Sequence, residues 1–158
     1  MNWQEVCEHP SLQDLPFKIE LNERGEIVMA PVKVVHSAYQ GELSFLLRSQ
    51  RQGGNVLVEC AIHTAKGTKV ADVAWASDAR FATIRNETEC SIAPEVCIEV
   101  LSLSNTDDEI AEKRQLYFDQ GAQEVWICHG DGDFHFYDAE GRREQSVLFP
   151  DFPRHIDI

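Results

Sequence analysis

The sequence is short of several features that define particular classes of protein. No apolar run approaches the roughly 18 residues that a membrane-spanning helix needs. Residues 1–8 carry neither a basic flank nor an apolar stretch, so this segment does not resemble a secretory signal. We find no internal repeat, low-complexity tract or linker. We therefore expect a single domain over residues 1–158 with a cytoplasmic location.

Cysteine is sparse and scattered. The five cysteines stand singly, without the close pairs that zinc ribbons and redox motifs use. We therefore expect neither disulfides nor a cysteine zinc site. Cys60, Cys97 and Cys128 each lie inside an apolar run, where a cysteine usually behaves as a small buried hydrophobe.

Basic residues are few as well. Lys and Arg number 14 against 27 Asp and Glu, which gives a net charge of −13. Proteins that bind nucleic acid without sequence preference do so by neutralising phosphates with Lys and Arg. Tight nonspecific DNA binding by one chain is therefore not expected. Bound divalent metal would offset part of the acidic charge without reversing its sign.

The sequence does contain an ordinary globular pattern, with 43% hydrophobic and 26% charged residues, which argues against disorder. Alternation predicts a hairpin over residues 17–29, and apolar runs predict strands over residues 56–62, 70–75, 94–101, 125–128 and 134–137. Helical spacing predicts helices over residues 34–48 and 107–119, with a short one after Ser77. A strand, a helix and a strand over residues 94–128 predict a right-handed crossover. The fold class is therefore α/β, with a mixed sheet flanked by helices and with N-terminal and C-terminal hairpins.

Lys113 stands where helical periodicity predicts core. At about 100° per residue, Ile110 and Tyr117 define one side of the helix from Asp107, and Lys113 falls between them. We therefore expect Lys113 to point inward. The structural alternative is a lysine whose stem packs on apolar neighbours while its ammonium reaches water.

Glu42 occupies a comparable position on the helix from Val34. The same spacing places Glu42 between Val35, Tyr39 and Leu46, on the side that we expect to face the sheet. A carboxylate there is out of place for a simple amphipathic helix. A single residue of this kind is more often a carboxylate at a helix end or rim than a catalytic group.

Asp72 and Glu99 interrupt two predicted strands. Asp72 lies within residues 70–75 and Glu99 within residues 96–101, although acidic residues are depleted in strand interiors. Either one alone is more often an edge residue or an ion-pair partner than a metal ligand. Together with Glu42 and Lys113, however, they place one irregularity on each of four elements around one sheet.

This set of residues fits the chemistry of phosphodiester hydrolysis. Mg²⁺ binds hard oxygen ligands, commonly one or two carboxylates together with substrate phosphate and water. A lysine near the attacking water can stabilise the charge that develops in the transition state or assist the attack. Two strand carboxylates and one inward lysine supply these groups.

Residues 93–127 resemble a known family. Their order is 93–102 (APEVCIEVLS), 112–117 (EKRQLY) and 121–127 (GAQEVWI). A proline-led strand ending in Glu-Val-Leu-Ser, a helix with Lys and Tyr, and then Gly and a Trp-bearing strand are similar to the Uma-two family of endonucleases. That family lies within the restriction-endonuclease-like PD-(D/E)XK superfamily. The N-terminal half follows the same plan, with a hairpin, a helix opened by His36, and Asp72 at the motif aspartate.

The resemblance implies roles for individual residues. Asp72 would be the motif aspartate and Glu99 the motif glutamate, both ligating metal together with the main-chain carbonyl of Val100. Many superfamily members carry the motif lysine two residues after that glutamate, where this chain has Leu101. The resemblance implies that Lys113, on the following helix, takes its place.

Three further positions bear on the comparison with the family. Glu42 would match the acid on the first helix. Ala71 and Leu103 stand where the family commonly has proline. Proline at these places shapes the backbone and does no chemistry, so neither change removes a catalytic group.

The resemblance implies an endonuclease that hydrolyses DNA with Mg²⁺, for which Mn²⁺ can substitute. One alternative is a catalytically inactive protein of the same fold that binds or scaffolds, which the acidic charge favours. A weaker alternative is a metal site on His129 and His135 across the terminal hairpin, where two histidines are more often surface residues. A homodimer is compatible with cutting both strands, because two-fold symmetry pairs active sites. The sequence locates no interface.

Overall fold

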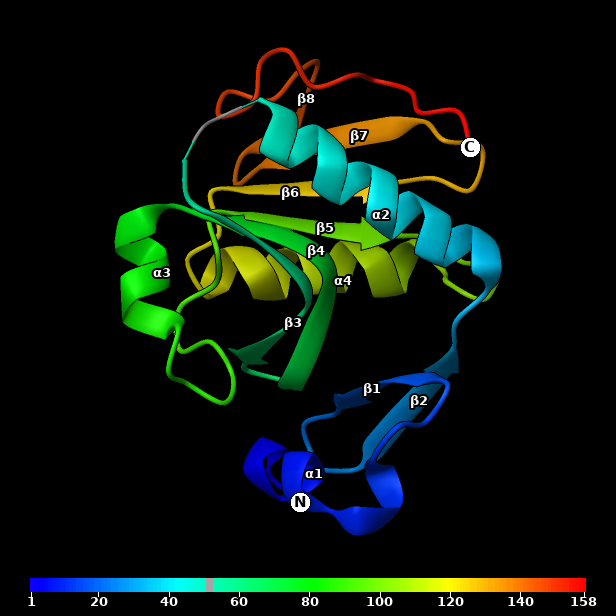
Figure 1. The fold of residues 1–158 in the computed structure, drawn as a ribbon, viewed down its shortest axis with the longest axis vertical. Coiled ribbons are helices and arrows are strands. Elements are labelled where there is room, and N and C mark those ends of the chain that lie inside the picture. The colour runs from blue at the N-terminus through cyan, green and yellow to red at the C-terminus, as the bar shows by residue number, and fades with distance from the viewer. Residues whose placement is uncertain (51–52) are drawn as a thin grey trace.

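The computed structural model describes residues 1–50 and 53–158 and is built around a six-stranded mixed sheet with the order β3-β4-β5-β6-β7-β8 (Figure 1). The strands are β3 (Asn55–Thr64), β4 (Gly67–Ala76), β5 (Val96–Val100), β6 (Glu124–Cys128), β7 (Phe134–Asp138) and β8 (Gly141–Arg143). Strands β5 and β6 pair in parallel, and the other neighbouring pairs in this sheet are antiparallel. The predicted α/β class with a mixed sheet is confirmed.

Helix α4 (Asp107–Asp119) makes the crossover between the parallel strands β5 and β6. It begins at a capping box, in which Thr106 accepts from the main chain of Glu109 and the Glu109 side chain accepts from the main chain of Thr106. This reciprocal pair satisfies two main-chain donors at the start of the helix. The helix ends before Gly121, whose φ of 103° lies in the region that favours glycine. The sequence predicts both ends of this helix.

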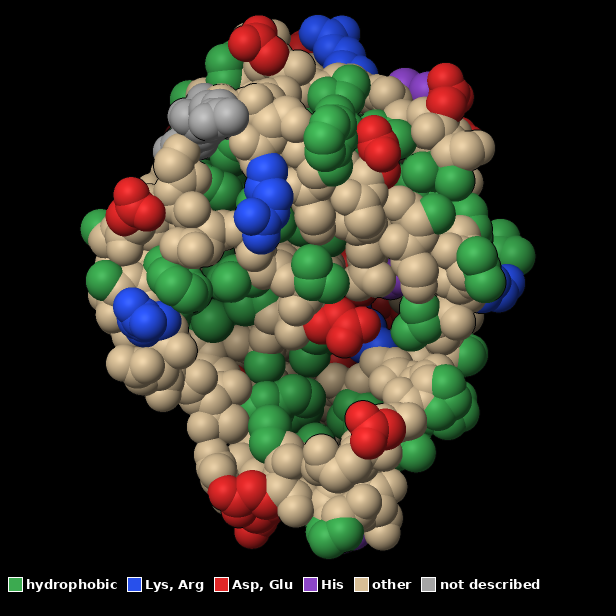
Figure 2. All heavy atoms as spheres, in the orientation of Figure 1, with side chains coloured by type: hydrophobic (Ala, Val, Ile, Leu, Met, Phe, Trp, Pro, Cys, Tyr) green, Lys and Arg blue, Asp and Glu red, His purple; other side chains and the backbone are tan. Residues whose placement is uncertain are grey.

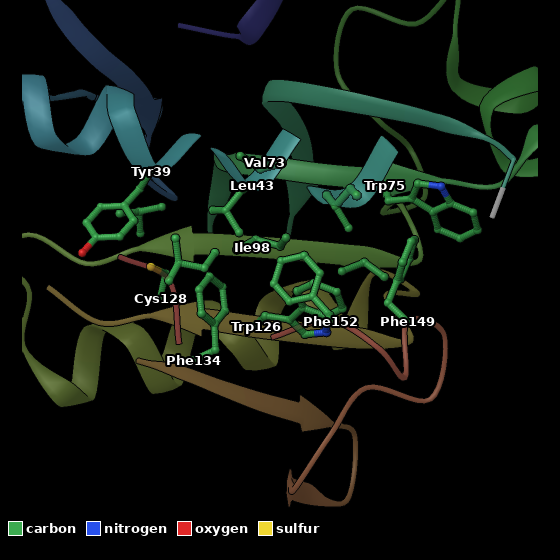
Figure 3. Close-up of a cluster of buried hydrophobic side chains, with 14 of the residues drawn as sticks. Tyr39, Leu43, Val73, Trp75, Ile98, Trp126, Cys128, Phe134, Phe149 and Phe152 are labelled. Atoms are coloured by element: carbon green, nitrogen blue, oxygen red, sulfur yellow. The ribbon is translucent and has the colours of Figure 1, made fainter. Parts of the chain in front are cut away.

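Helices α2 (Val34–Ser49) and α4 lie on opposite sides of the sheet, with α2 in front in Figure 1. Alternate residues of β5 therefore enter different cores. Val96 and Ile98 join Leu43 of α2 in one buried cluster, shown in Figure 3, while Cys97 joins Tyr117 of α4 in the other. A strand buried on both faces reads as a nearly continuous apolar run, and Glu99 is the exception in β5.

The N-terminal segment forms a separate hairpin beside the main sheet (Figure 1). It contains α1 (Trp3–Glu8), a 3₁₀ helix (Pro10–Leu12), β1 (Phe17–Leu21) and β2 (Ile27–Pro31). Its β1 strand docks at the start of β4, where Lys69 Nζ donates to the Leu21 carbonyl at 3.1 Å. A Cβ at Gly67 would lie 2.3 Å from that carbonyl oxygen, so only glycine permits this approach. The hairpin is therefore fixed against β4.

Short elements account for what the sequence patterns did not predict. Helix α1, the 3₁₀ helix and β8 span too few residues to show a periodicity. The short helix predicted after Ser77 is present as α3 (Asp78–Ile84), capped by the Ser77 side chain. Within residues 1–50 and 53–158, no helix has the length and apolar character needed to cross a membrane.

Candidate active site

Asp72 and Glu99 lie side by side on neighbouring strands. In the antiparallel pairing of β4 with β5, Val73 is opposite Ile98, so the next position in the register places Asp72 beside Glu99. Both residues are buried, with exposed fractions of 1% and 4%. Two buried carboxylates at this cross-strand spacing repel each other unless a cation lies between them.

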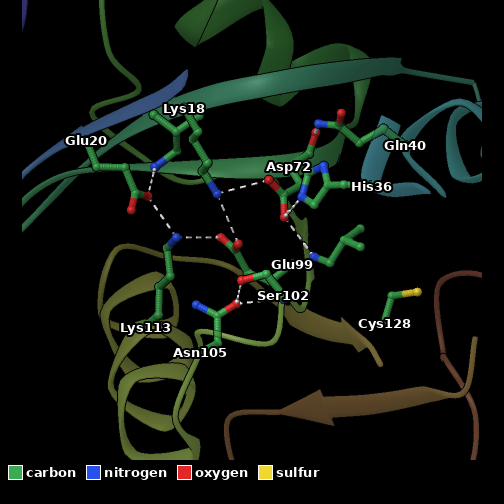
Figure 4. Close-up of polar contacts among 12 residues, drawn as sticks. Lys18, Glu20, His36, Gln40, Asp72, Glu99, Ser102, Asn105, Lys113 and Cys128 are labelled. Carbon is green, nitrogen blue, oxygen red and sulfur yellow. Dashed lines mark hydrogen bonds and ion pairs between the residues drawn. The ribbon is translucent and has the colours of Figure 1, made fainter. Parts of the chain in front are cut away.

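Lys18 of β1 supplies that cation. Its Nζ lies 2.9 Å from Asp72 Oδ1 and 3.2 Å from Glu99 Oε2, so one ammonium bridges both carboxylates (Figure 4). Burial lowers the pKa of Lys18, but Glu99 and Asp72 outweigh burial, and the pKa lies above its ordinary value. Lys18 is therefore charged, and the two strand carboxylates share one cationic position.

The second oxygen of Asp72 is held from two other directions. The main-chain N–H of Val100 donates to Asp72 Oδ2 at 2.7 Å, and His36 Nε2 of α2 lies 3.3 Å from the same oxygen. Burial raises the pKa of Asp72, but Lys18 and the hydrogen bond from His36 outweigh burial and hold it below its ordinary value. The hydrogen bond to Asp72 in turn raises the pKa of His36. Asp72 is thus ionised, with Oδ1 left to face Lys18.

The main chain of Asp72 also departs from regular pairing. The ladder between β3 and β4 skips Glu59 and Asp72, and Glu59 adopts a φ of 53°, a conformation uncommon outside glycine. Gln40 Nε2 of α2 donates to the Asp72 carbonyl at 3.2 Å. Helix α2 therefore supplies a donor to the Asp72 carbonyl where the pairing of β3 with β4 is interrupted. Both the side chain and the main-chain carbonyl of Asp72 are thus held in place.

Glu99 is fixed through its other oxygen. Tyr117 Oη donates to Glu99 Oε1 at 2.6 Å, and Lys113 Nζ lies 3.1 Å from that oxygen. Burial raises the pKa of Glu99, and Lys113 and Lys18 offset this only in part. Burial and the neighbouring Glu99 raise the pKa of Tyr117 well above its ordinary value, so the phenol stays a neutral donor. Glu99 Oε1 is thus held by α4, and Oε2 faces Lys18.

Lys113 connects α4 with the hairpin. Its Nζ lies 2.7 Å from Glu20 Oε2, and Glu20 Oε2 also accepts the main-chain N–H of Val70 at 2.6 Å. Lys18 and Lys113 each join two carboxylates, and the three acids and two lysines alternate in charge (Figure 4). Lys113 lies between the buried Ile110 and Tyr117, as predicted, and its side chain is only 15% exposed. The structure therefore brings Asp72, Glu99 and Lys113 together.

The prediction that Glu42 faces the sheet is wrong. The buried residues of α2 are Tyr39, Gln40, Leu43 and Leu47, which places Glu42 roughly a third of a turn away from the centre of that face. Glu42 does not line the cavity beside Asp72 and Glu99. Val35 misled the assignment of the helix face, because this apolar side chain is 50% exposed.

A cavity of about 330 Å³ opens beside this cluster. Its polar lining includes Lys18, Glu20, His36, Lys69, Asp72, Glu99, Ser102, Asn105, Glu109, Glu112 and Lys113. Figure 2 shows acidic and basic side chains together in the hollow between α2 and the hairpin. The cavity is therefore lined by both signs of charge, with five carboxylates and three lysines.

The donor set fits Mg²⁺ in chemistry but is small. Asp72 Oδ1 and Glu99 Oε2 already converge on one cation, the Lys18 ammonium. Among residues 1–50 and 53–158, no group of three or more His, Cys, Asp or Glu side chains could hold a metal ion. Mg²⁺ commonly takes one or two carboxylates and completes its shell with water and substrate phosphate. Two carboxylates beside an open cavity match that requirement.

Several site residues were not predicted. Lys18 and Glu20 stand two positions apart in β1 and so share a face of the strand, but both look like ordinary hairpin residues in the sequence. Gln40 is a polar residue on the buried side of α2, and correct phasing of the helix would have identified it. Tyr117 was assigned to the core, and only the fold shows its Oη against Glu99.

His129 and His135 also meet, as their places on a hairpin predict. His129 Nε2 lies 3.0 Å from His135 Nδ1, so one imidazole donates to the other. Burial and the neighbouring His129 lower the pKa of His135. Nothing in the described part of the chain joins these two rings in a group of three metal ligands. The pair is a hydrogen-bonded contact between β7 and the end of β6.

Comparison with known proteins identifies similar sequences and folds. The Uma2 family model, described as "Putative restriction endonuclease", matches residues 3–153. A crystal structure from Anabaena variabilis, titled "a putative nuclease belonging to DUF820", has a TM-score of 0.69 and 21% sequence identity. The match covers 92% of this chain and 82% of that one. No significant match is found among curated proteins.

Proposed function

The chain belongs to the Uma2 family, and we propose that it is an endonuclease that hydrolyses DNA with Mg²⁺, or Mn²⁺ in its place. The observation that carries this proposal is the convergence of Asp72 and Glu99 on one cationic position, with Lys113 against Glu99. These are the groups that metal-dependent phosphodiester hydrolysis requires. The neighbouring cavity gives a phosphate access to them.

In this proposal the residues around the cavity have different roles. Asp72 and Glu99 would hold the metal, which when bound polarises the phosphate and activates water. Tyr117 and Val100 each fix one carboxylate oxygen, which leaves Asp72 Oδ1 and Glu99 Oε2 directed at the shared position. Lys113 Nζ would donate a hydrogen bond to the attacking water and offset the negative charge that develops on the phosphoryl oxygens.

The second candidate is a protein of this fold that binds without catalysis. The observation in its favour is Lys18, whose ammonium pairs with both strand carboxylates. The net charge of −13 also disfavours a tight grip on DNA. Calorimetry separates the two candidates, because a scaffold would show no Mg²⁺ or Mn²⁺ binding that depends on Asp72 and Glu99.

Nicking of supercoiled plasmid with Mg²⁺ or Mn²⁺ tests the proposal directly. We expect the variants Asp72→Asn, Glu99→Gln and Lys113→Gln each to lose at least about 100-fold in rate, since each removes several kcal/mol of transition-state stabilisation. Arg114→Gln is the matched control, because Arg114 is next to Lys113 but stacks on the Tyr137 ring at 3.9 Å. Nicking that survives the first three changes would come from a contaminant. A labelled RNA substrate in parallel reports the preferred nucleic acid.

A further inference from the structure

Each oxygen of the Asp72 and Glu99 carboxylates has a partner. Asp72 Oδ2 is engaged by the Val100 N–H and His36, and Glu99 Oε1 by Tyr117 and Lys113. The remaining two oxygens, Asp72 Oδ1 and Glu99 Oε2, both bind the ammonium of one residue, Lys18. Lys18 is therefore the cation that the two carboxylates share.

A divalent ion that bridges the two carboxylates needs these same two oxygens. The others face a main-chain amide, a histidine, a phenol and a second lysine, which hold the carboxylates in place. The Lys18 ammonium lies 2.9 Å and 3.2 Å from these oxygens. A divalent cation bound to the same two oxygens would therefore repel it strongly. The two cations therefore exclude each other from this position.

We infer that Lys18 competes with the metal. Its ammonium occupies the position between Asp72 Oδ1 and Glu99 Oε2 until a divalent cation displaces it. This inference rests on the proposed function and adds a residue that regulates the same site. The inference also assigns a role to the hairpin. Strand β1 carries the Lys18 ammonium to the point where β4 and β5 place two acids side by side.

Contacts that do not involve Lys18 attach the hairpin, so the Lys18 ammonium can move while the hairpin stays in place. Glu20 is fixed by Val70 and Lys113, and the Leu21 carbonyl by Lys69. Lys18 has a flexible four-carbon stem, so its Nζ can swing into the cavity while the strand stays in place. The same cavity is where a substrate phosphate would reach the metal, so the displaced ammonium would meet the phosphate.

Metal titration by calorimetry, in the absence of nucleic acid, tests the competition. Lys18→Gln removes the competing charge, so we expect it to bind Mn²⁺ and Mg²⁺ at least about tenfold more tightly than the wild type, a modest part of the Coulomb energy at this range. Lys66→Gln is the control, since Lys66 is an exposed lysine that pairs with Glu112 and has no ion pair with Asp72 or Glu99. Equal or weaker metal binding by Lys18→Gln, or tightening of the same size in Lys66→Gln, overturns the inference.

A second measurement uses the unaltered protein and does not depend on the folding of a variant. Lysine acetylation followed by mass spectrometry should modify Lys18 slowly without metal, because its side chain is 12% exposed and paired. Saturating Mg²⁺ should accelerate modification of Lys18 several-fold and leave Lys66, which is exposed, unchanged. An unchanged rate at Lys18 contradicts the inference.

The two proposals fail in different ways. If the wild type binds Mg²⁺ and nicks plasmid while Lys18→Gln binds metal no better, only the competition is wrong. If neither protein binds metal in the absence or presence of DNA, the metal-dependent function and the competition are both wrong.

Discussion

Gln40 Nε2 donates a hydrogen bond to the main-chain carbonyl of Asp72 at 3.2 Å, at the position where β3 and β4 do not pair. Helix α2 thus completes the hydrogen bonding of β4, the strand that pairs with β5. Both groups are buried, so bulk water cannot supply the carbonyl with another hydrogen-bond donor. The candidate site is therefore built partly on a contact between a helix and a break in the sheet.

This contact predicts that Gln40→Ala destabilises the protein. The buried carbonyl of Asp72 would lose its donor, which costs about 1–3 kcal/mol of unfolding free energy. Urea denaturation measures the change, with Glu42→Gln as the control on the same helix. Since Glu42 lies off the buried face, we expect a change within about 0.5 kcal/mol there. A larger loss in the control than in Gln40→Ala would contradict the assigned helix face.

Gly67 predicts how firmly the hairpin is attached. Its φ is 87° and an added Cβ would lie 2.3 Å from the Leu21 and Asn22 carbonyl oxygens, so Gly67→Ala should cost at least about 2 kcal/mol. Hydrogen exchange should also rise in residues 17–31. Gly130→Ala is the control, because nothing lies within 4 Å of its Cβ position. Equal stability of the two variants would show that the hairpin does not depend on this approach.

Tyr117→Phe isolates the hydrogen bond to Glu99. The ring is fully buried and its Oη donates to a carboxylate at 2.6 Å, so its loss should cost about 1.5–3 kcal/mol. Denaturation at neutral pH measures the loss. The pKa of Glu99, already raised by burial, should rise further, because a donor to its ionised form is gone. Carboxyl titration by NMR measures this shift, and an unchanged pKa of Glu99 in Tyr117→Phe would mean that Tyr117 serves only to fill space.

The raised pKa of His36 predicts a pH dependence of stability in metal-free protein. The hydrogen bond to Asp72 raises that pKa in the folded state above its ordinary value of about 6.5. Its stabilising effect is therefore fully present below about pH 6.5 and is lost as the pH rises through the folded value. We expect the stability difference between wild type and His36→Gln to be larger at about pH 6 than at about pH 9. Equal differences at both values would mean that His36 is neutral throughout.

The sequence could predict much of the fold because periodicity is local. Apolar runs, the capping box at Thr106 and the glycine at 121 determine where strands and helices begin and end. The same local patterns placed Lys113 on the inward side of α4. They failed for Glu42, because Val35 at the start of α2 follows the apolar spacing of a buried face although it is 50% exposed.

By itself, the sequence determined the α/β class, the family and the residues Asp72, Glu99 and Lys113 as a candidate set. Only the tertiary structure decided that Lys18 lies between the two carboxylates, that Glu20 holds Lys113, and that His36 and Gln40 orient Asp72. The physical reason is that these contacts join residues 32 to 93 positions apart. Such contacts depend on how the hairpin and α2 pack against the sheet, which no local pattern encodes.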